Sequence, residues 1–275
     1  MNRLPLAKRC QIIQLLVEGN SLRSCSRIAD VSLTTVIKLL VDVGQACINF
    51  HDQTIVQIKS QRIQCDEMWS FVYSKEKNTP EGETGKGSVW VWIAMDADTK
   101  LIISWLVGER NENFAHAFMK DLASRLKGET QITTDGYSHY TGAINAAFDT
   151  HVDFAQLVKQ YSRAKTGEVH NNNETGNGGR YIGAKKVIMF GQPNPKFIST
   201  SYIERQNLTV RMCSRRFTRK TNAFSKKVEN HGYALALNFV YYNFVRIHRS
   251  LRITPAMQAG LCKKPMTFAD IATLA

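Results

Sequence analysis

Apolar side chains recur at helical spacing in three successive segments of the first fifty residues. They gather between residues 12 and 17, and Gly19 then follows as a stop signal. Ser21 and Ser32 stand where they can cap a second, short helix and a third, longer one. A short helix, a tight turn and a longer helix make up the helix-turn-helix arrangement. We therefore predict an all-α helix-turn-helix domain over residues 1–50.

The third of these helices carries the residues that such a domain would present to DNA. In a helix-turn-helix, the N-terminal part of the last helix enters the major groove. Here that part contains Thr34, Thr35 and Lys38, which we expect to face bases or phosphates while the intervening apolar residues pack inward. A three-helix core with no role in DNA binding is the alternative, and the pattern leaves it open.

From residue 60 onward, the pattern alternates between strands and helices. Three segments rich in aromatic and β-branched residues come first and predict an antiparallel meander. An amphipathic helix, a short buried strand, a second helix and a fifth strand follow. The order βββαβαβ predicts an α/β fold, with a five-stranded mixed sheet and flanking helices. The expected strands are 62–74, 87–96, 101–109, 130–135 and 151–158, and the expected helices are 112–128 and 138–148.

Residues 159–200 break this alternation. They are polar and rich in Gly and Asn, which is typical of a loop. Residues 181–195 suggest a hairpin within it. We therefore expect an insertion at about 159–200, after which a helix carries Glu204.

Positive charge is concentrated after Glu204. The chain of 275 residues has a formal net charge of +13 and an isoelectric point near 9.5. Residues 205–264 hold thirteen Lys or Arg residues and one acid, whereas residues 1–50 hold six and three. Such a concentration predicts a polyanionic partner, most simply nucleic acid.

The six cysteines have no spacing that suits a zinc site or a disulfide framework. We expect reduced, mostly buried thiols and no zinc. The N-terminus lacks the apolar core of a signal peptide, and no run of 18 apolar residues is present, so no membrane span is expected. The expected location is the cytoplasm.

Three carboxylates stand out from the remaining acids. Asp66 lies within an apolar strand, where an acid is costly to bury unless it is paired or binds a cation. Asp135 ends the fourth strand before Gly136, where a turn or helix cap alone would be the favoured interpretation. The first and fourth strands of such a sheet are neighbours, so these two acids can approach each other, with a helix bringing Glu204 over them. Three oxygen ligands of this kind suit Mg²⁺ or Mn²⁺.

Glu204 lies near the start of a helix that becomes basic. At helical spacing, Glu204, Leu208, Arg211 and Arg215 share one face. The acid can then reach a metal while the arginines meet phosphates beyond it. A solvated charged face is the alternative. It predicts mixed signs, whereas this chain has no acid between Glu204 and Glu229.

The three carboxylates lie in segments that resemble the catalytic blocks of the DDE transposases, most closely the bacterial insertion-sequence-one family. The blocks are CDEMWSFV, ITTDGYSHY and YIERQNLTVRMCSRRFTRKTNAFSKKVE. The segment YYNFVRIHRSLRITPAM, residues 241–257, also resembles the C-terminal part of integrase-like transposases. The resemblance covers about residues 60–257. It implies an RNase H-like catalytic domain over that range, followed by a C-terminal tail over residues 258–275.

The resemblance also implies an activity. Asp66, Asp135 and Glu204 would be the catalytic residues and would hold two Mg²⁺ ions, with Mn²⁺ able to substitute. The reactions would be DNA end cleavage and strand transfer of an insertion sequence, by hydrolysis and transesterification of phosphodiesters. The partners would be double-stranded DNA, as terminal inverted repeats and target, and further copies of the chain in a dimer or larger assembly in the prokaryotic nucleoid. The predicted DNA-binding residues are Thr34, Thr35, Lys38, Asn207, Arg211, Arg215, Arg216, Arg219, Lys220, Lys226 and Lys227.

Two features depart from the family, and three alternatives stay open. Some relatives place a Cys-rich zinc-binding segment before the helix-turn-helix, which this chain lacks, and its loop at 159–200 is long. An RNase H-like nuclease would hydrolyse DNA without joining it. A non-catalytic DNA-binding regulator derived from a transposase predicts the loss of an acid. A structural nucleic-acid-binding protein leaves Asp66 unexplained.

Overall fold

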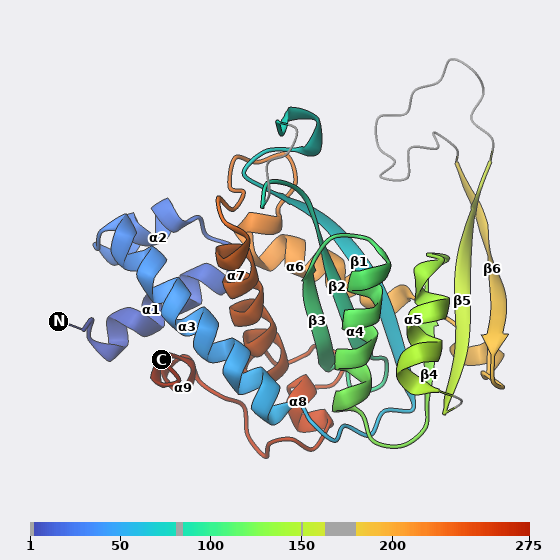
Figure 1. The fold of residues 1–275 in the computed structure, drawn as a ribbon. Helices are drawn as coiled ribbons and strands as arrows, with labels where there is room; N and C mark the ends of the chain where they lie inside the picture. Colours follow the sequence, from blue (N-terminus) through green and yellow to red (C-terminus); the bar gives the residue numbers. More distant parts are fainter. Residues whose placement is uncertain (1–2, 81–84, 150, 163–179) are drawn as a thin grey trace.

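A mixed sheet of six strands forms the centre of the molecule in a computed structural model that describes residues 3–80, 85–149, 151–162 and 180–275 (Figure 1). The strand order is β3-β2-β1-β4-β5-β6. The predicted antiparallel meander is confirmed, and so is the prediction that the first and fourth strands are neighbours. The strands are β1 Arg62–Val72, β2 Gly87–Asp96, β3 Ile102–Gly108, β4 Thr130–Thr134, β5 Val152–Tyr161 and β6 Tyr181–Phe190.

Helices cover both faces of this sheet (Figure 1). On one face, α4 (Glu112–Arg125) and α5 (His139–Phe148) bury the large side chains of Phe118, Tyr140 and Trp92. On the other face, α6 (Ser201–Cys213) and α7 (Val228–Val240) enclose a second apolar cluster. Because strand side chains alternate between faces, successive residues of β1 point into different layers. Asp66 and Glu67 therefore start out on opposite sides of the sheet.

The sixth strand corrects the predicted five-stranded sheet. Residues 181–190, expected to form a hairpin within an insertion, pair antiparallel with β5 from Phe154↔Phe190 to Tyr161↔Tyr181. Most of β6 is exposed, so it has no buried face to impose an alternating apolar pattern. The two strands extend together beyond the body of the molecule (Figure 1). Within the predicted loop at 159–200, residues 163–179 lie outside the described residues.

The three N-terminal helices form as predicted. They are α1 (Leu6–Val17), α2 (Leu22–Ala29) and α3 (Leu33–Thr54). Ser21 Oγ accepts from the backbone N–H of Ser24, and Ser32 Oγ from that of Thr35, each over 3.1 Å. Each hydroxyl satisfies a donor that the first helical turn leaves unpaired, so both predicted caps are confirmed.

Helix α3 joins the N-terminal helices to the rest of the chain. It runs beyond the expected end near residue 50 because His51 is buried, with its Nε2 3.0 Å from the backbone oxygen of Ile103 on β3. At Gly44 it comes so close to α7 that a Cβ would stand 2.4 Å from that of Tyr233. The segment predicted as a C-terminal tail carries α8 (Pro255–Gln258) and α9 (Phe268–Thr273), and α9 packs on α1.

Helix α3 is apolar over most of its length. Among the described residues, it is the one helix whose length and composition would allow it to cross a membrane, a test that core helices also pass. Its side chains Val36, Leu40 and Val43 are buried in the same core as Leu237 of α7. In all, 33% of the apolar window of α3 is buried in the protein.

Asn243 is expected to be a large contributor to stability because its side chain pairs with a strand. It lies in a π-helical turn after α7, is fully buried, donates to the carbonyl of Ile102 over 2.9 Å and accepts from that residue's N–H over 3.0 Å. Asn243→Ala leaves two buried backbone groups unpaired, and we expect it to lower the free energy of unfolding by about 2–4 kcal/mol. Urea denaturation measures this. Asn145→Ala, at an exposed position of α5, is the control, and an equal effect of the two changes would refute this role for Asn243.

Candidate metal centre

Asp66 and Asp135 are brought together by the parallel register of β1 and β4. The last paired residues are Gln64 and Thr133, and continuing that register by two residues places Asp66 beside Asp135. β4 ends at Thr134, so at this point the edge of β1 faces a gap rather than a hydrogen-bonded neighbour. The carboxylates gather in this gap.

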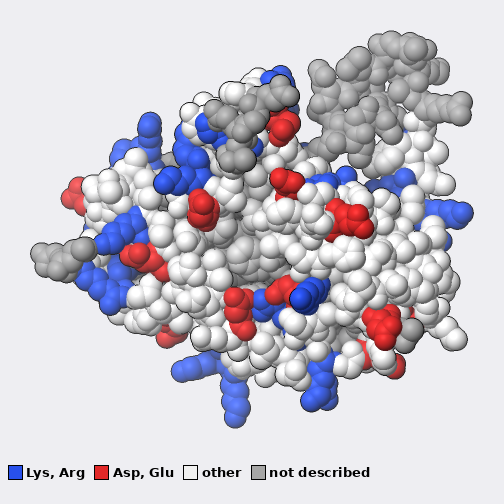
Figure 2. Space-filling model, viewed as in Figure 1, with Lys and Arg blue, Asp and Glu red and all other residues white. Residues whose placement is uncertain are grey.

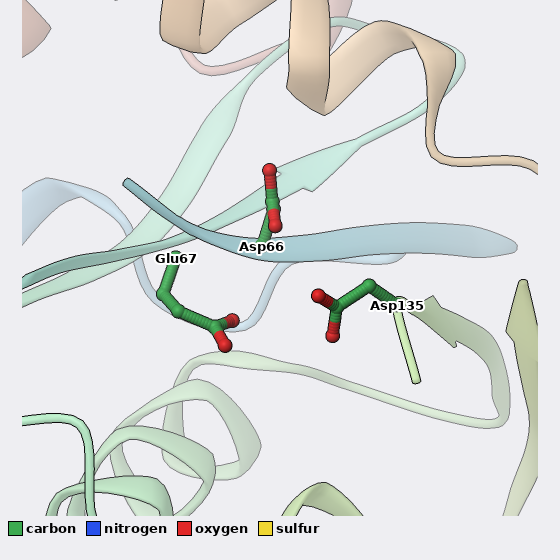
Figure 3. A group of neighbouring side chains, drawn as sticks. All are labelled: Asp66, Glu67 and Asp135. Carbon is green, nitrogen blue, oxygen red and sulfur yellow. The ribbon is translucent and has the colours of Figure 1, made fainter. Parts of the chain in front are cut away.

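Glu67 completes the cluster. One carboxylate oxygen from each of Asp66, Glu67 and Asp135 lies within 4.8 Å of the others. Figure 3 shows Asp66 and Glu67 leaving opposite sides of β1, with the Asp135 carboxylate turned toward them. The open strand edge allows side chains from the two faces to meet. We call these three residues the acidic cluster.

Burial and mutual repulsion act on the acidic cluster. Burial raises the pKa of Asp66 well above its usual range, the charges of Glu67 and Asp135 raise it further, and Lys159 opposes them. Burial also raises the pKa of Glu67 to about 7, with a further contribution from Asp135, although Arg110 and Tyr140 lower it. Bringing like charges this close is unfavourable without a cation. The cluster therefore has the electrostatics of a cation site.

The donor atoms fit a hard divalent cation. All three side chains of the acidic cluster offer oxygen, the donor that Mg²⁺ and Mn²⁺ prefer. Beside them, Asn207 Oδ1 is buried and has no hydrogen-bond partner among the described atoms. An unpaired amide oxygen next to a carboxylate is a further potential ligand. The acidic cluster could therefore hold a divalent cation.

The sequence analysis missed Glu67. It accepts hydrogen bonds from Arg110 Nε over 2.7 Å and from the Tyr140 hydroxyl over 2.8 Å. The Arg110 guanidinium is in turn stacked over the ring of Tyr137. Strand periodicity placed Glu67 on the other face from Asp66, and this hid its proximity. The available signal was the one used for Asp66, an acid within an apolar strand.

Helix α6 is fixed along β1 by polar contacts at three levels. Gln64 Oε1 accepts from the backbone N–H groups of Tyr202 and Ile203 over 2.9 and 3.1 Å. One turn further on, Asn207 Nδ2 donates to Asp66 Oδ2 over 2.7 Å. Arg211 Nη2 then donates to the carbonyl of Trp69 over 3.1 Å. The start, middle and end of α6 are thus held against Gln64, Asp66 and Trp69 of β1.

Glu204 lies beside the acidic cluster rather than within it. It precedes Asn207 by one helical turn, and its Oε1 accepts from Lys159 Nζ over 2.9 Å and from Thr200 Oγ1 over 2.6 Å. Burial lowers the pKa of Lys159, but the hydrogen bond and the charge of Glu204 outweigh it and raise that pKa overall. Of the three predicted acids, the structure brings Asp66 and Asp135 together and pairs Glu204 with Lys159.

The predicted shared face of Glu204 and Arg215 is wrong. Helix α6 ends at Cys213, and Arg215 lies in the following short 3₁₀ turn, so helical spacing no longer relates the two. Arg216 is directed into the protein, where Nη1 donates to Ser225 Oγ over 2.8 Å. Ser225 Oγ in turn lies 2.8 Å from Nδ1 of the buried His231. Arg211 and Arg216 therefore already have partners within the chain.

Asn207, also predicted to bind DNA, instead pairs with Asp66, whereas the remaining predicted DNA-binding residues lie at or near the surface. Thr34 and Lys38 are exposed at the start of α3, and Thr35 is partly covered by its contact with Ser32. Figure 2 shows many of the Lys and Arg side chains around the margin of the face that it presents, including a group over the N-terminal helices. The exposed members of the segment after α6 are Arg215, Arg219, Lys220, Lys226 and Lys227.

No family model and no curated protein matches the sequence. Among solved structures, the chain is similar to piggyBac transposase in a synaptic complex with hairpin DNA, at 9% identity and a TM-score of 0.44, over 98% of this chain and 69% of that one. It is also similar to the Mos1 strand transfer complex and to Mos1 transposase in a paired-end complex with the left transposon end. Both share 11% identity at a TM-score of 0.25, over 56% of this chain and 59% and 60% of the Mos1 chains. At these identities and TM-scores the similarity does not establish a function, which has to be inferred from the residues of the site.

Proposed function

We propose that this chain is a DDE transposase of the insertion-sequence-one kind, which cuts transposon ends and joins them to target DNA in the presence of Mg²⁺. The observation that carries the proposal is the convergence of Asp66, Glu67 and Asp135 at the open edge of β1. Glu204 stands beside them on α6, immediately ahead of the exposed basic segment. In this proposal the sheet and its helices form an RNase H-like core.

The residues have separate tasks in the proposed reaction. Asp66, Asp135 and Glu204 hold the metal, with Glu67 as a further ligand. When bound, Mg²⁺ activates the attacking oxygen and stabilises the leaving oxygen at phosphorus. Water first attacks a phosphodiester at the transposon end and breaks its bond to the 3′-oxygen, which leaves as a 3′-hydroxyl. That hydroxyl then attacks a phosphodiester of the target and displaces the 3′-oxygen of the target strand. Asn207 orients Asp66 through its 2.7 Å hydrogen bond.

Duplex DNA is the proposed substrate on both sides of the reaction. The start of α3, with Thr34, Thr35 and Lys38, reads the terminal repeat, and the exposed residues after α6 hold the backbone. Joining two ends to one target requires at least two active sites, so we propose a dimer or larger assembly on DNA, acting in the nucleoid.

A cleavage and joining assay tests this function. The protein is mixed with a labelled duplex taken from the DNA that borders its gene, a plasmid target and Mg²⁺, and Asp66→Asn and Asp135→Asn run beside it. Label transferred to the plasmid by the parent, and by neither variant, would support the transposase. Cleavage without joining would indicate a nuclease, and binding without any broken phosphodiester would indicate a regulator.

The exposed lysines after α6 are expected to set the salt dependence of DNA binding. The logarithm of the binding constant falls linearly with the logarithm of the salt concentration, and each phosphate that a lysine neutralises makes this slope more negative by about 0.9. Combined Lys220→Ala, Lys226→Ala and Lys227→Ala should therefore lower the slope in magnitude by roughly 0.9 for each phosphate that is no longer neutralised. Fluorescence anisotropy across a salt series measures it. Lys127→Ala, also exposed, is the control, and an unchanged slope in the triple variant would place the DNA elsewhere.

A further inference from the structure

We propose that Lys159 forms an ion pair with Glu204 in the metal-free protein and that this pair breaks when metal binds to Glu204. The released ammonium then binds a DNA phosphate. This inference rests on the proposed function. It assigns Lys159 a positioning role through Glu204, followed by contact with the substrate.

The first support is the set of contacts around Glu204. Its Oε1 takes hydrogen bonds from both Lys159, at 2.9 Å, and Thr200, at 2.6 Å. The side chains of Lys159 and Glu204 are 36% and 41% exposed, so a cation from solvent can reach the pair. Ion pairs with this exposure are weak. A divalent ion shared with the acidic cluster can therefore replace the ammonium without opening the core.

The second support is the fixed position of α6. Gln64 holds its first turn, and Asn207 ties its middle to Asp66 over 2.7 Å. Because residues three apart share a helix face, Glu204 lies on the side of α6 that faces Asp66. In the proposed exchange, the Glu204 side chain moves while α6 stays in place, and the charge of Glu204 already acts on Asp66. Lys159 is close enough for its charge to act on Asp66 as well as on Glu204.

The third support is the position of Lys159 in the sheet. It lies on β5, opposite Ala184 of β6, and the next residues along β6 are Lys185 and Lys186. Because side chains alternate along a strand, Lys159 shares its face of the sheet with Lys186, while Lys185 is on the opposite face. A DNA backbone entering the metal site would meet the ammonium of Lys159, and a lysine with no remaining acid partner binds phosphate as a point charge.

The test measures Mn²⁺ binding without DNA, by electron paramagnetic resonance of the free ion. We expect Lys159→Met to tighten Mn²⁺ binding by roughly twofold to fivefold, because no ammonium competes for Glu204. Lys159→Arg retains a competing cation and should stay near the parent. Lys185→Met removes the same charge from the neighbouring strand and is the control for general electrostatics. Equal or weaker Mn²⁺ binding in Lys159→Met than in Lys185→Met would overturn the inference.

Two further measurements separate this inference from the proposed function. In Glu204→Gln, the change at Lys159 should no longer affect Mn²⁺ binding, and an undiminished effect would show that Lys159 acts elsewhere. DNA affinity in Ca²⁺ should fall severalfold in Lys159→Met. If Mn²⁺ binding depends on Asp135 but not on Lys159, the metal site stands and the exchange is wrong. If the parent binds no Mn²⁺ through Asp66 and Asp135, both proposals fail.

Discussion

Asp66→Asn or Asp135→Asn is expected to abolish DNA cleavage and, at the same time, to raise the melting temperature of the metal-free protein. The two effects have one cause. The acidic cluster holds carboxylate oxygens within 4.8 Å of one another, which is favourable only when a cation lies between them. Asparagine keeps the shape of the side chain and removes the charge, so it relieves repulsion and weakens metal binding together.

The expected loss of cleavage rate is at least about a thousandfold, since metal coordination contributes several kcal/mol to such reactions and about 4 kcal/mol corresponds to that factor. Thermal melting in EDTA and in Mg²⁺ gives the second readout. The parent should gain stability from Mg²⁺, and the variants should gain little or none. Variants that melt lower than the parent in EDTA would show that these carboxylates stabilise the fold rather than await a metal.

In the absence of divalent cations, the contribution of Glu67 to the free energy of unfolding is expected to fall as pH rises from about 4.5 to about 7, while the buried His51 and His231, whose pKa values are lowered by burial, act in the opposite direction. Burial raises the pKa of Glu67 from 4.5 to about 7, with Asp135 adding to the effect. At Glu67 the folded state therefore binds more protons than the unfolded state across this interval, so the contribution of this residue to stability decreases with pH. The full effect of Glu67 is on the order of 3 kcal/mol. It is present below pH 4.5 and is lost as pH passes the folded pKa.

Urea denaturation at a series of pH values in EDTA measures this dependence. The free energy of unfolding of Glu67→Gln relative to that of the parent should rise with pH between 4.5 and 7, because the amide does not titrate. Glu129→Gln, at an exposed position before β4, should leave the curve as it is. A difference between parent and Glu67→Gln that stays constant across this interval would show that Glu67 does not carry the effect.

The sequence predicted the part of the site that depends on strand order. A meander followed by an αβ unit places the first and fourth strands together, and that adjacency is sufficient to bring Asp66 near Asp135. The helix caps at Ser21 and Ser32 were equally predictable, because a cap depends on residues that are close in the sequence.

What the sequence did not predict depends on the ends of elements and on long-range contacts. The carboxylates of Glu67 and Asp135 lie close together because β4 ends at Thr134, two residues before the position that would lie opposite Glu67. Strand periodicity does not predict where a strand ends. Arg215 leaves the face of Glu204 because α6 ends at Cys213. The pairing of Glu204 with Lys159 joins residues far apart in the chain, and no local pattern marks it. The exposed strand β6 lacks the alternation that would have identified it.

Joining of a labelled transposon end to plasmid DNA tests the central claim most directly. With the parent chain in Mg²⁺, we predict that label appears in the plasmid, that EDTA prevents it, and that Asp66→Asn and Asp135→Asn give none. A plasmid that stays unlabelled while the same protein binds and cuts the labelled end would contradict the transposase and identify a nuclease. A joined product that persists in both variants would contradict the assignment of the acidic cluster as the metal site.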